Sequence, residues 1–364
     1  MPDIWPQSLI ELQPRGDTEY ISQGRTVLVC NREGWVDEDP HQALWIYQAS
    51  ALSLYRWLLN GKSPELSAFS KVKQNSSLGY YIAAPKNCKK TETHDCDPAQ
   101  HSLELRISRT VGEGMHEDIE LTNHTQIATT AELALEIASD FASPAGAERK
   151  SPPGRITKNW RRVDAQSWEL VFDYTARHTY SHQGEKGTAR VHRGLRLLLR
   201  CRPLKLHFSG NKLRLRIRLA PRASWHACLS WIAHIEGREL PLEAGCDREK
   251  KEERGSREMK RQVFLAESTH FASAQNVDLS GLVMSTVRRS ASDLLDLRLF
   301  DLDAKDRQGE AWIPAAGLPT YLGLFGRDSL AAGWQAALLS TSPMRGTMAE
   351  LPKTQGIRID DWRD

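Results

Sequence analysis

The chain has 364 residues, and its 49 Lys and Arg against 46 Asp and Glu leave a net charge of +3, too small for a global attraction to nucleic acid or membrane. Apolar residues make up 40% of the chain and charged residues 26%, which excludes a collagen-like or wholly disordered protein. No stretch reaches the roughly 18 apolar residues of a membrane-spanning helix, and the length favours two domains.

Between about residues 20 and 271, apolar side chains mostly recur at every second position. Such alternation places one face of a strand on a core and the other face in water. Many short strands of this kind predict a mainly β, antiparallel sandwich. The clearest runs are Leu103, Leu105 and Ile107, then Leu133, Leu135 and Ile137, and finally Leu213, Leu215, Ile217 and Leu219 with Arg214, Arg216 and Arg218 between them.

Turn and loop signals divide this region. Asn60-Gly61 follows the apolar run 52–59, and Ser209-Gly210-Asn211 separates two strand-like runs, so both predict tight hairpins. Residues 84–101 and 142–155 are predicted loops. Residues 247–261 carry twelve charges of both signs, which fits either an exposed loop or a short solvated helix.

After Phe271 the apolar spacing changes to three and four residues, which indicates helices. We therefore place the boundary between a strand domain (1–272) and a helical domain (273–364) near residues 272–280. A loop from about residue 301 to 318 separates two helices. The first has Asp278 or Ser280 as its cap and the stripe Val283, Val287, Ala291, Leu294 and Leu295; the second begins near Arg327 with the stripe Leu330, Ala331, Trp334, Ala337 and Leu338.

Six cysteines are few for this length, and none forms a Cys-x-x-Cys pair. Cys88 and Cys96 flank His94, but the spacing matches no standard zinc pattern. We therefore expect reduced thiols, no metal and no cofactor. The first residues lack a basic segment followed by an apolar one, so no signal peptide is expected and the predicted location is cytoplasmic.

The largest local charge anomaly is the stretch 186–222, which holds twelve Lys or Arg and no Asp or Glu. Nucleic-acid binding would require these residues on one face with stacking aromatic side chains, yet Phe208 is the one Phe, Trp or Tyr in the stretch. The favoured interpretation is a solvated strand face paired with acidic neighbours. No nucleic-acid partner is expected, although an anionic polymer surface remains an alternative.

Motifs for phosphate binding, for a zinc protease and for a serine nucleophile elbow are absent from the sequence. Arg327 and Asp328 stand side by side where a loop leads into a helix, near Tyr321 and Phe325. A guanidinium and a carboxylate can bind the vicinal hydroxyls of a sugar, while aromatic rings cover its apolar face. A pair that only caps the helix is an equally weighted alternative.

Several strings resemble the glycogen debranching family of amylo-α-1,6-glucosidase type. GLPTYLGLFGRDSLAAGWQAALL, MRGTMAELPKTQG and DDWRD resemble the start of the catalytic domain in that family. SSLGYYI (76–82), LRISRTVGEGMHEDIELTNHT (105–125), DYTARHTYSHQGEKGTARVHRGLRL (173–197) and FLAESTHF (264–271) resemble the preceding sandwich domain of bacterial members.

The resemblance implies a sandwich followed by an (α/α)6 barrel that hydrolyses α-1,6-glucosidic bonds. It also implies that Arg327 and Asp328 bind a glucose unit of an α-glucan or oligosaccharide; Tyr321 and Phe325, which stand beside them in the sequence, are candidate substrate-binding residues as well. Trp362 and Arg363 are further candidate substrate-binding residues in the same cleft.

The resemblance covers two or three of the twelve barrel helices, so the all-α part is expected to be incomplete. Glycoside hydrolysis needs two carboxylates, and in the family both come further along, so we assign no catalytic residue and expect a truncated product. A non-catalytic carbohydrate-binding or scaffolding sandwich is the alternative function. Self-association is expected through uncovered helix faces, namely at Leu294, Leu295, Trp334 and Leu338.

Overall fold

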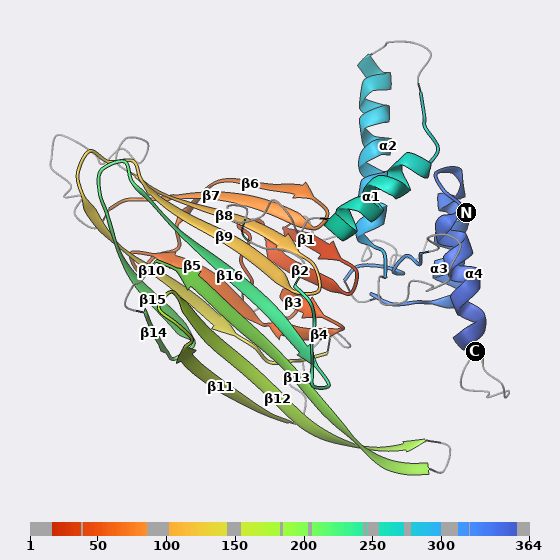
Figure 1. Cartoon of the computed structure of the whole chain (residues 1–364), viewed down its shortest axis with the longest axis horizontal. Helices are drawn as coiled ribbons and strands as arrows, with labels where there is room; N and C mark the ends of the chain where they lie inside the picture. Colours follow the sequence, from red (N-terminus) through yellow and green to blue (C-terminus); the bar gives the residue numbers. More distant parts are fainter. Residues whose placement is uncertain are drawn as a thin grey trace, which may run out of the picture.

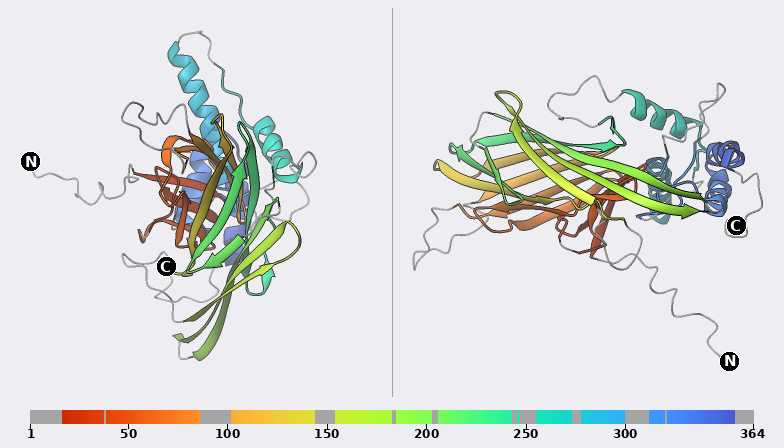
Figure 2. Two further views of the ribbon diagram at one scale, coloured as in Figure 1. Left: turned by 90° about the vertical axis from the view of Figure 1, so that its left-hand side faces the viewer. Right: turned by 90° about the horizontal axis from the view of Figure 1, so that it is seen from below.

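The structure is a computed structural model that describes residues 17–37, 39–85, 102–143, 154–182, 185–202, 206–242, 246, 255–272, 278–299, 312–319 and 321–354. It confirms the predicted fold class, an antiparallel β-sandwich with a small helical part. Figures 1 and 2 show the helices gathered at one end of an elongated body of strands. Among the described residues, no helix combines the length and the apolar character needed to cross a membrane.

Among the described residues, three antiparallel sheets make up the strand region. The first contains β1 (Thr18–Gln23), β2 (Thr26–Asn31), β3 (Ala43–Ile46) and β4 (Ala49–Leu52) in that order. The second has the order β14 (Leu206–Ser209), β15 (Lys212–Leu219), β10 (Thr129–Ala138) and β5 (Leu54–Leu59). The third has nine strands in the described part of the chain. Their order is β11 (Gly154–Arg162), β12 (Ser167–His182), β13 (Glu185–Cys201), β16 (Ser224–Ile235), β9 (Met115–Asn123), β8 (Leu103–Val111), β7 (Ser76–Ala83) and β6 (Glu65–Lys73), with β17 (Arg238–Glu239) on β16.

The alternating residues form one large core between the nine-stranded sheet and the two smaller sheets. All three runs singled out in the sequence point into this core, and Arg214, Arg216 and Arg218 face solvent as predicted. Burying a large aliphatic side chain contributes on the order of 2 kcal/mol relative to its exposure. The repeated alternation is therefore what holds the sandwich together.

Both predicted hairpin turns are present. Asn60 and Gly61 have φ values of 55° and 83°, and the backbone of Leu59 bonds that of Lys62 across the turn. Gly210 and Asn211 have φ values of 55° and 63° between β14 and β15. Asn and Gly tolerate this left-handed region, which the tight turn requires at both central positions.

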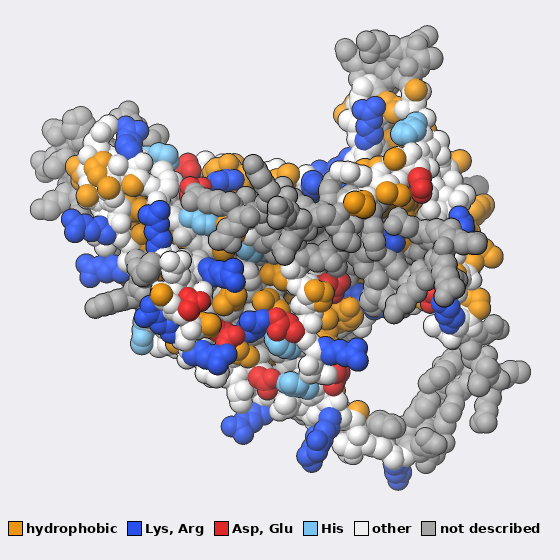
Figure 3. All heavy atoms as spheres, in the orientation of Figure 1, with side chains coloured by type: hydrophobic (Ala, Val, Ile, Leu, Met, Phe, Trp, Pro, Cys, Tyr) orange, Lys and Arg blue, Asp and Glu red, His pale blue; other side chains and the backbone are white. Residues whose placement is uncertain are grey.

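The basic stretch lies mainly on β13 and β15, where opposite charges neighbour it. Arg196 contacts Glu169 and Glu239, and Lys212 Nζ lies 2.6 Å from Glu136 Oε1. Figure 3 shows Lys and Arg side chains intermixed with acidic and His side chains over the strands in the lower half of the view. These pairs support the solvated strand face, and the absence of a nucleic-acid partner stays a prediction.

The helices are α1 (Gly255–Glu267), α2 (Asp278–Asp296), α3 (Gly326–Gln335), the 3-10 turn η3 (Ala336–Leu338) and α4 (Ser342–Thr354). The last strand among the described residues ends at Glu239, and the prediction of a period of two as far as Phe271 is wrong over α1. There Phe264 is buried against Leu295 and Trp312, and the more buried positions recur at helical spacing. Within 247–261, the described residues from Gly255 onward form a helix, which was one of the two predicted alternatives. The predicted division into two domains stays a prediction.

Helix α2 is buried only towards its C-terminal end. Ala291 and Leu295 lie in the interior, whereas Val283 is exposed, so the predicted apolar stripe is covered at one end alone. Figure 1 shows the rest of α2 rising away from the strands. Leu294 and Leu295 pack beside Trp312, and the expectation that they are uncovered is wrong because α1 lies over them.

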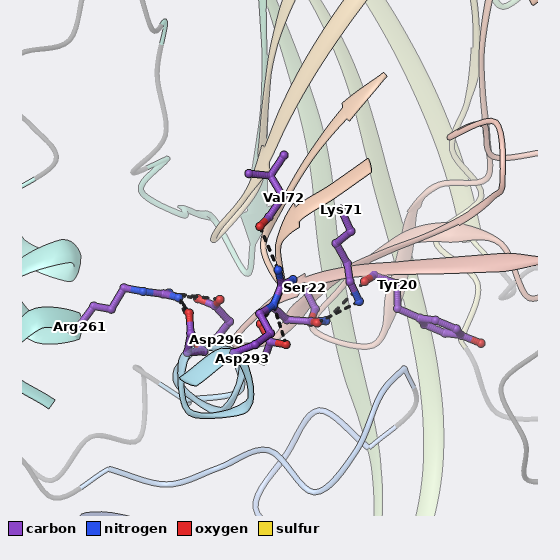
Figure 4. A network of polar contacts seen from close by, with 10 residues as sticks. Tyr20, Ser22, Lys71, Val72, Arg261, Asp293 and Asp296 are labelled. Carbon is purple, nitrogen blue, oxygen red and sulfur yellow. Dashed lines mark hydrogen bonds and ion pairs between the residues drawn. The ribbon is translucent and has the colours of Figure 1, made fainter. Parts of the chain in front are cut away.

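A polar joint connects α2 to the sandwich (Figure 4). Arg261 of α1 pairs with Asp296 at the end of α2, at 3.1 Å, and the Gly24 N–H donates to the Asp296 carbonyl oxygen at 2.9 Å. Arg289 pairs with Asp293 one turn along α2 and donates to the Val72 carbonyl oxygen at 3.1 Å. The turn after β1 and the end of β6 thus both hold the helix.

The first sheet is covered on its second face by the segment that leads to α3. Val27, Val29, Ala43 and Trp45 point away from the main core and pack against Leu299, Ile313, Ala315 and Leu322. The base of the loop before α3 is therefore part of a second, smaller core.

Candidate functional site

The predicted sugar-binding residues surround the start of α3. Phe325 stands just before the helix with extended backbone angles (φ −123°, ψ 128°). Its N–H donates to Ser329 Oγ at 3.3 Å, while the Ser329 N–H donates to the Phe325 carbonyl oxygen at 2.8 Å. Ser329 is fully buried. The first bond satisfies the Phe325 N–H, which a helix start leaves free, and the second is the first hydrogen bond within α3; together they fix the direction in which the chain enters the helix.

The loop before α3 is a short, closed turn. Gly317 and Tyr321 exchange two backbone hydrogen bonds of 3.1 and 3.0 Å. Leu322 then turns into the smaller core, and Arg25 Nη1 donates to its carbonyl oxygen at 3.2 Å. The backbone pairing and the hydrogen bond from Arg25 hold the turn against the first sheet. Side chains that point outward from the turn therefore extend from a fixed backbone.

Two aromatic rings extend from this backbone towards solvent. The rings of Tyr321 and Phe325 lie 5.5 Å apart, edge to face at 89°. Both side chains are exposed, although large apolar side chains are usually buried. The structure therefore brings together two of the predicted residues in a geometry that leaves aromatic surface open to a ligand.

Arg327 and Asp328 are also exposed, in the first turn of α3. Consecutive helix residues do not face each other, and among the described residues no ion pair joins the two side chains. Asp328 also lies in the first turn of the helix, where the helix dipole stabilises a carboxylate, so a pair that only caps the helix stays the alternative prediction. Trp362 and Arg363 lie outside the described residues.

The outward face of α3 and η3 is apolar and open. All five residues of the predicted stripe are partly or fully uncovered, with Trp334 at 74% and Leu338 at 79% exposure. The opposite face packs on α4, where Gly333 leaves room for Met344. The expectation that Trp334 and Leu338 are uncovered is confirmed.

A buried ion pair, which the sequence analysis missed, lies in the main core. Arg109 Nε donates to Glu117 Oε1 at 2.6 Å, and both side chains are essentially without solvent contact. Tyr55 and Trp231 donate to the same carboxylate at 2.6 and 2.8 Å. Burial raises the pKa of Tyr55 well above its ordinary value, so its hydroxyl stays a donor. Full burial makes this network a part of the main core.

The sequence does carry a signal for this pair. Arg109 interrupts the apolar alternation of β8 at a core position, and Glu117 does the same in β9. The two residues are direct partners across the hairpin, as their equal distance from its turn implies. Opposite charges at matched core positions of one hairpin therefore predict a buried pair.

The cysteines divide into two groups. Cys30, Cys201, Cys228 and Cys246 are buried and free. Burial raises the pKa of the Cys30 and Cys201 thiols to about 12. Cys88, Cys96 and His94, the loose metal candidate of the sequence, lie outside the described residues.

Comparison with solved structures finds partial similarities at low identity. A galactose mutarotase-like protein from Clostridium acetobutylicum shares 9% identity at a TM-score of 0.29, covering 59% of this chain and 94% of that one. A galactose mutarotase related enzyme from Lactobacillus acidophilus shares 10% at 0.28, covering 62% and 100%. A protein described as a kojibiose phosphorylase from the human microbiome shares 10% at 0.32, covering 61% of this chain and 26% of that one. Similarities at this level carry no argument about fold or activity.

No curated protein matches the sequence. A family match does exist: residues 21–230 match the N-terminal domain of (some) glycogen debranching enzymes. The matched range runs from β1 into β16 and includes most of the sandwich core. It confirms the resemblance found in the sequence. Because it spans more than half of the 364 residues, the chain belongs to the family of N-terminal domains of glycogen debranching enzymes.

Proposed function

We propose that the protein acts on α-glucans as a glycoside hydrolase component of glycogen-debranching type, and that it binds a glucose unit at the start of α3. The observation that carries the site is the exposed, edge-to-face pair of Tyr321 and Phe325 beside exposed Arg327 and Asp328, on a base anchored to the first sheet. Family membership supports the α-glucan as the ligand class.

Each side chain has a separate part in this binding. The Arg327 guanidinium donates to sugar hydroxyls, and the Asp328 carboxylate accepts from them. The aromatic rings cover the C–H face of the sugar, which is apolar. Hydrolysis of an α-1,6 bond needs two further carboxylates that flank it. In this proposal Asp328 holds a hydroxyl and is neither of them.

Binding measurements with single variants test the site. We expect Asp328→Asn and Arg327→Ala each to weaken binding of a maltooligosaccharide about tenfold or more in titration calorimetry, since hydrogen bonds to charged groups are worth about 1.5 to 3 kcal/mol. Arg345→Ala is the matched control, because Arg345 is an exposed arginine on the neighbouring helix α4. Unchanged affinity in both test variants would contradict the proposed site.

A non-catalytic carbohydrate-binding sandwich is the second candidate, and the position of the family match within the sandwich favours it. It predicts that glucan binding survives Asp328→Asn and that an α-1,6-linked glucan is not cleaved. Release of glucose from such a glucan, followed with the purified chain, would decide for the hydrolase.

A further inference from the structure

Four metal-ligating side chains meet on the outer face of the nine-stranded sheet. Asp118 of β9 lies directly across from Cys228 of β16, and His226 is two residues before Cys228 on the same strand. Cross-strand partners and residues two apart share a face of the sheet. The intervening Ile119 and Ala227 point into the main core. Strand pairing alone therefore sets three of the four side chains side by side.

Cys246, which follows β17 in the chain, brings the fourth side chain. One ligand atom from each of the four residues lies within 4.8 Å of all the others. His226 Nε2 is 2.9 Å and Cys228 Sγ is 3.3 Å from Asp118 Oδ1, and the sulfur and the nitrogen are 3.9 Å apart. Cys228 and Cys246 are 8% and 6% exposed, so the two sulfur ligands are shielded from water, whereas the Asp118 and His226 side chains are partly exposed.

A second histidine lies beside the carboxylate of Asp118. His116 is buried, and its Nε2 lies 3.6 Å from Asp118 Oδ2, the oxygen that does not face His226 or Cys228. Its Nδ1 lies 3.2 Å from Ser230 Oγ, while Nε2 makes no hydrogen bond among the described residues. At 3.6 Å the His116 ring gives the Asp118 carboxylate a polar neighbour without a hydrogen bond to it.

We propose that Asp118, His226, Cys228 and Cys246 bind one zinc ion. Two thiolates, an imidazole and a carboxylate form a mixed N, O and S set that suits Zn²⁺, and tetrahedral ligation puts ligand atoms about 3.3 to 3.8 Å apart. Four protein ligands leave no open position, so the ion is structural. It fixes residue 246, which lies between β17 and α1, to the sheet and so ties the chain leading to the helices to the sandwich.

The test uses the reduced full-length chain after chelation, titrated with Zn²⁺ and separately with Co²⁺. We expect one ion per chain, a thiolate-to-cobalt charge-transfer band, and a higher Tm with Zn²⁺. His226→Asn and Cys228→Ser are each expected to weaken Zn²⁺ binding about 100-fold or more. Cys201→Ser, which removes a buried cysteine of β13 outside the cluster, is the matched control and is expected to leave affinity and band unchanged.

Three results would overturn the proposal. One is the absence of stoichiometric binding by the correctly folded wild-type chain. Another is a band that persists in Cys228→Ser and disappears in a Cys88→Ser, Cys96→Ser double variant, which would place the ion elsewhere. The third is a disulfide between Cys228 and Cys246 that mass spectrometry detects in the isolated chain and that re-forms after reduction even when Zn²⁺ is present. His226→Asn keeps the test open if the cysteine variants fail to fold, because its side chain is partly exposed.

Discussion

The sandwich and the α3–α4 hairpin differ in how far their large apolar side chains are buried. In the sandwich, Trp35, Trp57 and Trp231 are fully buried, and even an ion pair is enclosed with them. On α3 and η3, Trp334 and Leu338 stand almost free in solvent. The difference shows that the sandwich completes its own core from residues within it, whereas the outward face of α3 is covered by no described residue.

The largest expected effect on stability comes from breaking the buried ion pair of the sandwich. Glu117→Ala leaves the Arg109 guanidinium, the Tyr55 hydroxyl and the Trp231 N–H buried without their acceptor. Removing one partner of a buried pair costs about 3 to 5 kcal/mol. We expect a loss of this size in urea unfolding.

Replacing both charges at once is the control for that variant. Arg109→Met with Glu117→Leu removes the uncompensated charge and is expected to cost clearly less than Glu117→Ala alone. Equal losses in the two proteins would mean that packing, and not the unpaired charge, sets the cost.

The joint between the two regions gives a pH-dependent effect. Burial raises the pKa of Asp296 from 3.8 to about 6, against the opposing charge of Arg261, and such a difference corresponds to about 3 kcal/mol at most. Because the folded state holds this proton more tightly, the stabilisation is complete below pH 3.8 and is lost as the pH rises through 6.

Asp296→Asn, which cannot titrate, isolates that contribution. We expect the free energy of unfolding of the wild type to fall relative to Asp296→Asn between pH 4.5 and 7, measured by urea unfolding at each pH. Parallel curves for the two proteins would contradict the raised pKa.

Two glycine variants compare the inside and the outside of the helical part. A Cβ on Gly346 of α4 would lie 2.3 Å from the Trp312 carbonyl oxygen, so Gly346→Ala is expected to cost about 1 to 3 kcal/mol. Gly281 of α2 has open space around it, and Gly281→Ala is expected to stabilise by up to about 1 kcal/mol. Thermal unfolding measures both, and a stabilising Gly346→Ala would show that α4 is loosely packed on Trp312.

The smallest stability effect belongs to the open face of α3. Trp334→Gln with Leu338→Gln is expected to change stability by less than about 0.5 kcal/mol, because both side chains are exposed. The same variant is expected to reduce self-association in sedimentation velocity, while Ile127→Gln, at an exposed apolar side chain of the sandwich, is not. A monodisperse wild-type monomer at all concentrations would make the predicted self-association wrong.

Much of the strand region and part of the site follow from local patterns. The alternation in β8, β10 and β15, both hairpin turns and the start of α3 are where the sequence places them. The expected period of two as far as Phe271 is wrong over α1, where the more buried Arg261, Phe264 and Leu265 recur at a helical spacing that a short window cannot separate from that of a strand. The zinc cluster was missed, since Asp118, His226 and Cys246 are far apart in sequence and no spacing rule connects them.

The sequence by itself determined which residues face inward, because alternation along a strand and turn chemistry act over a few neighbouring positions. Only the tertiary structure decided which strands are neighbours, such as β5 beside β10, and hence that Asp118 meets Cys228 across β9 and β16. Which strands pair depends on contacts between segments that are far apart in the sequence. These contacts form together, because only the complete set of strands buries the core. The same holds for Trp334, whose helix is evident in the sequence and whose exposure is set by what packs around it.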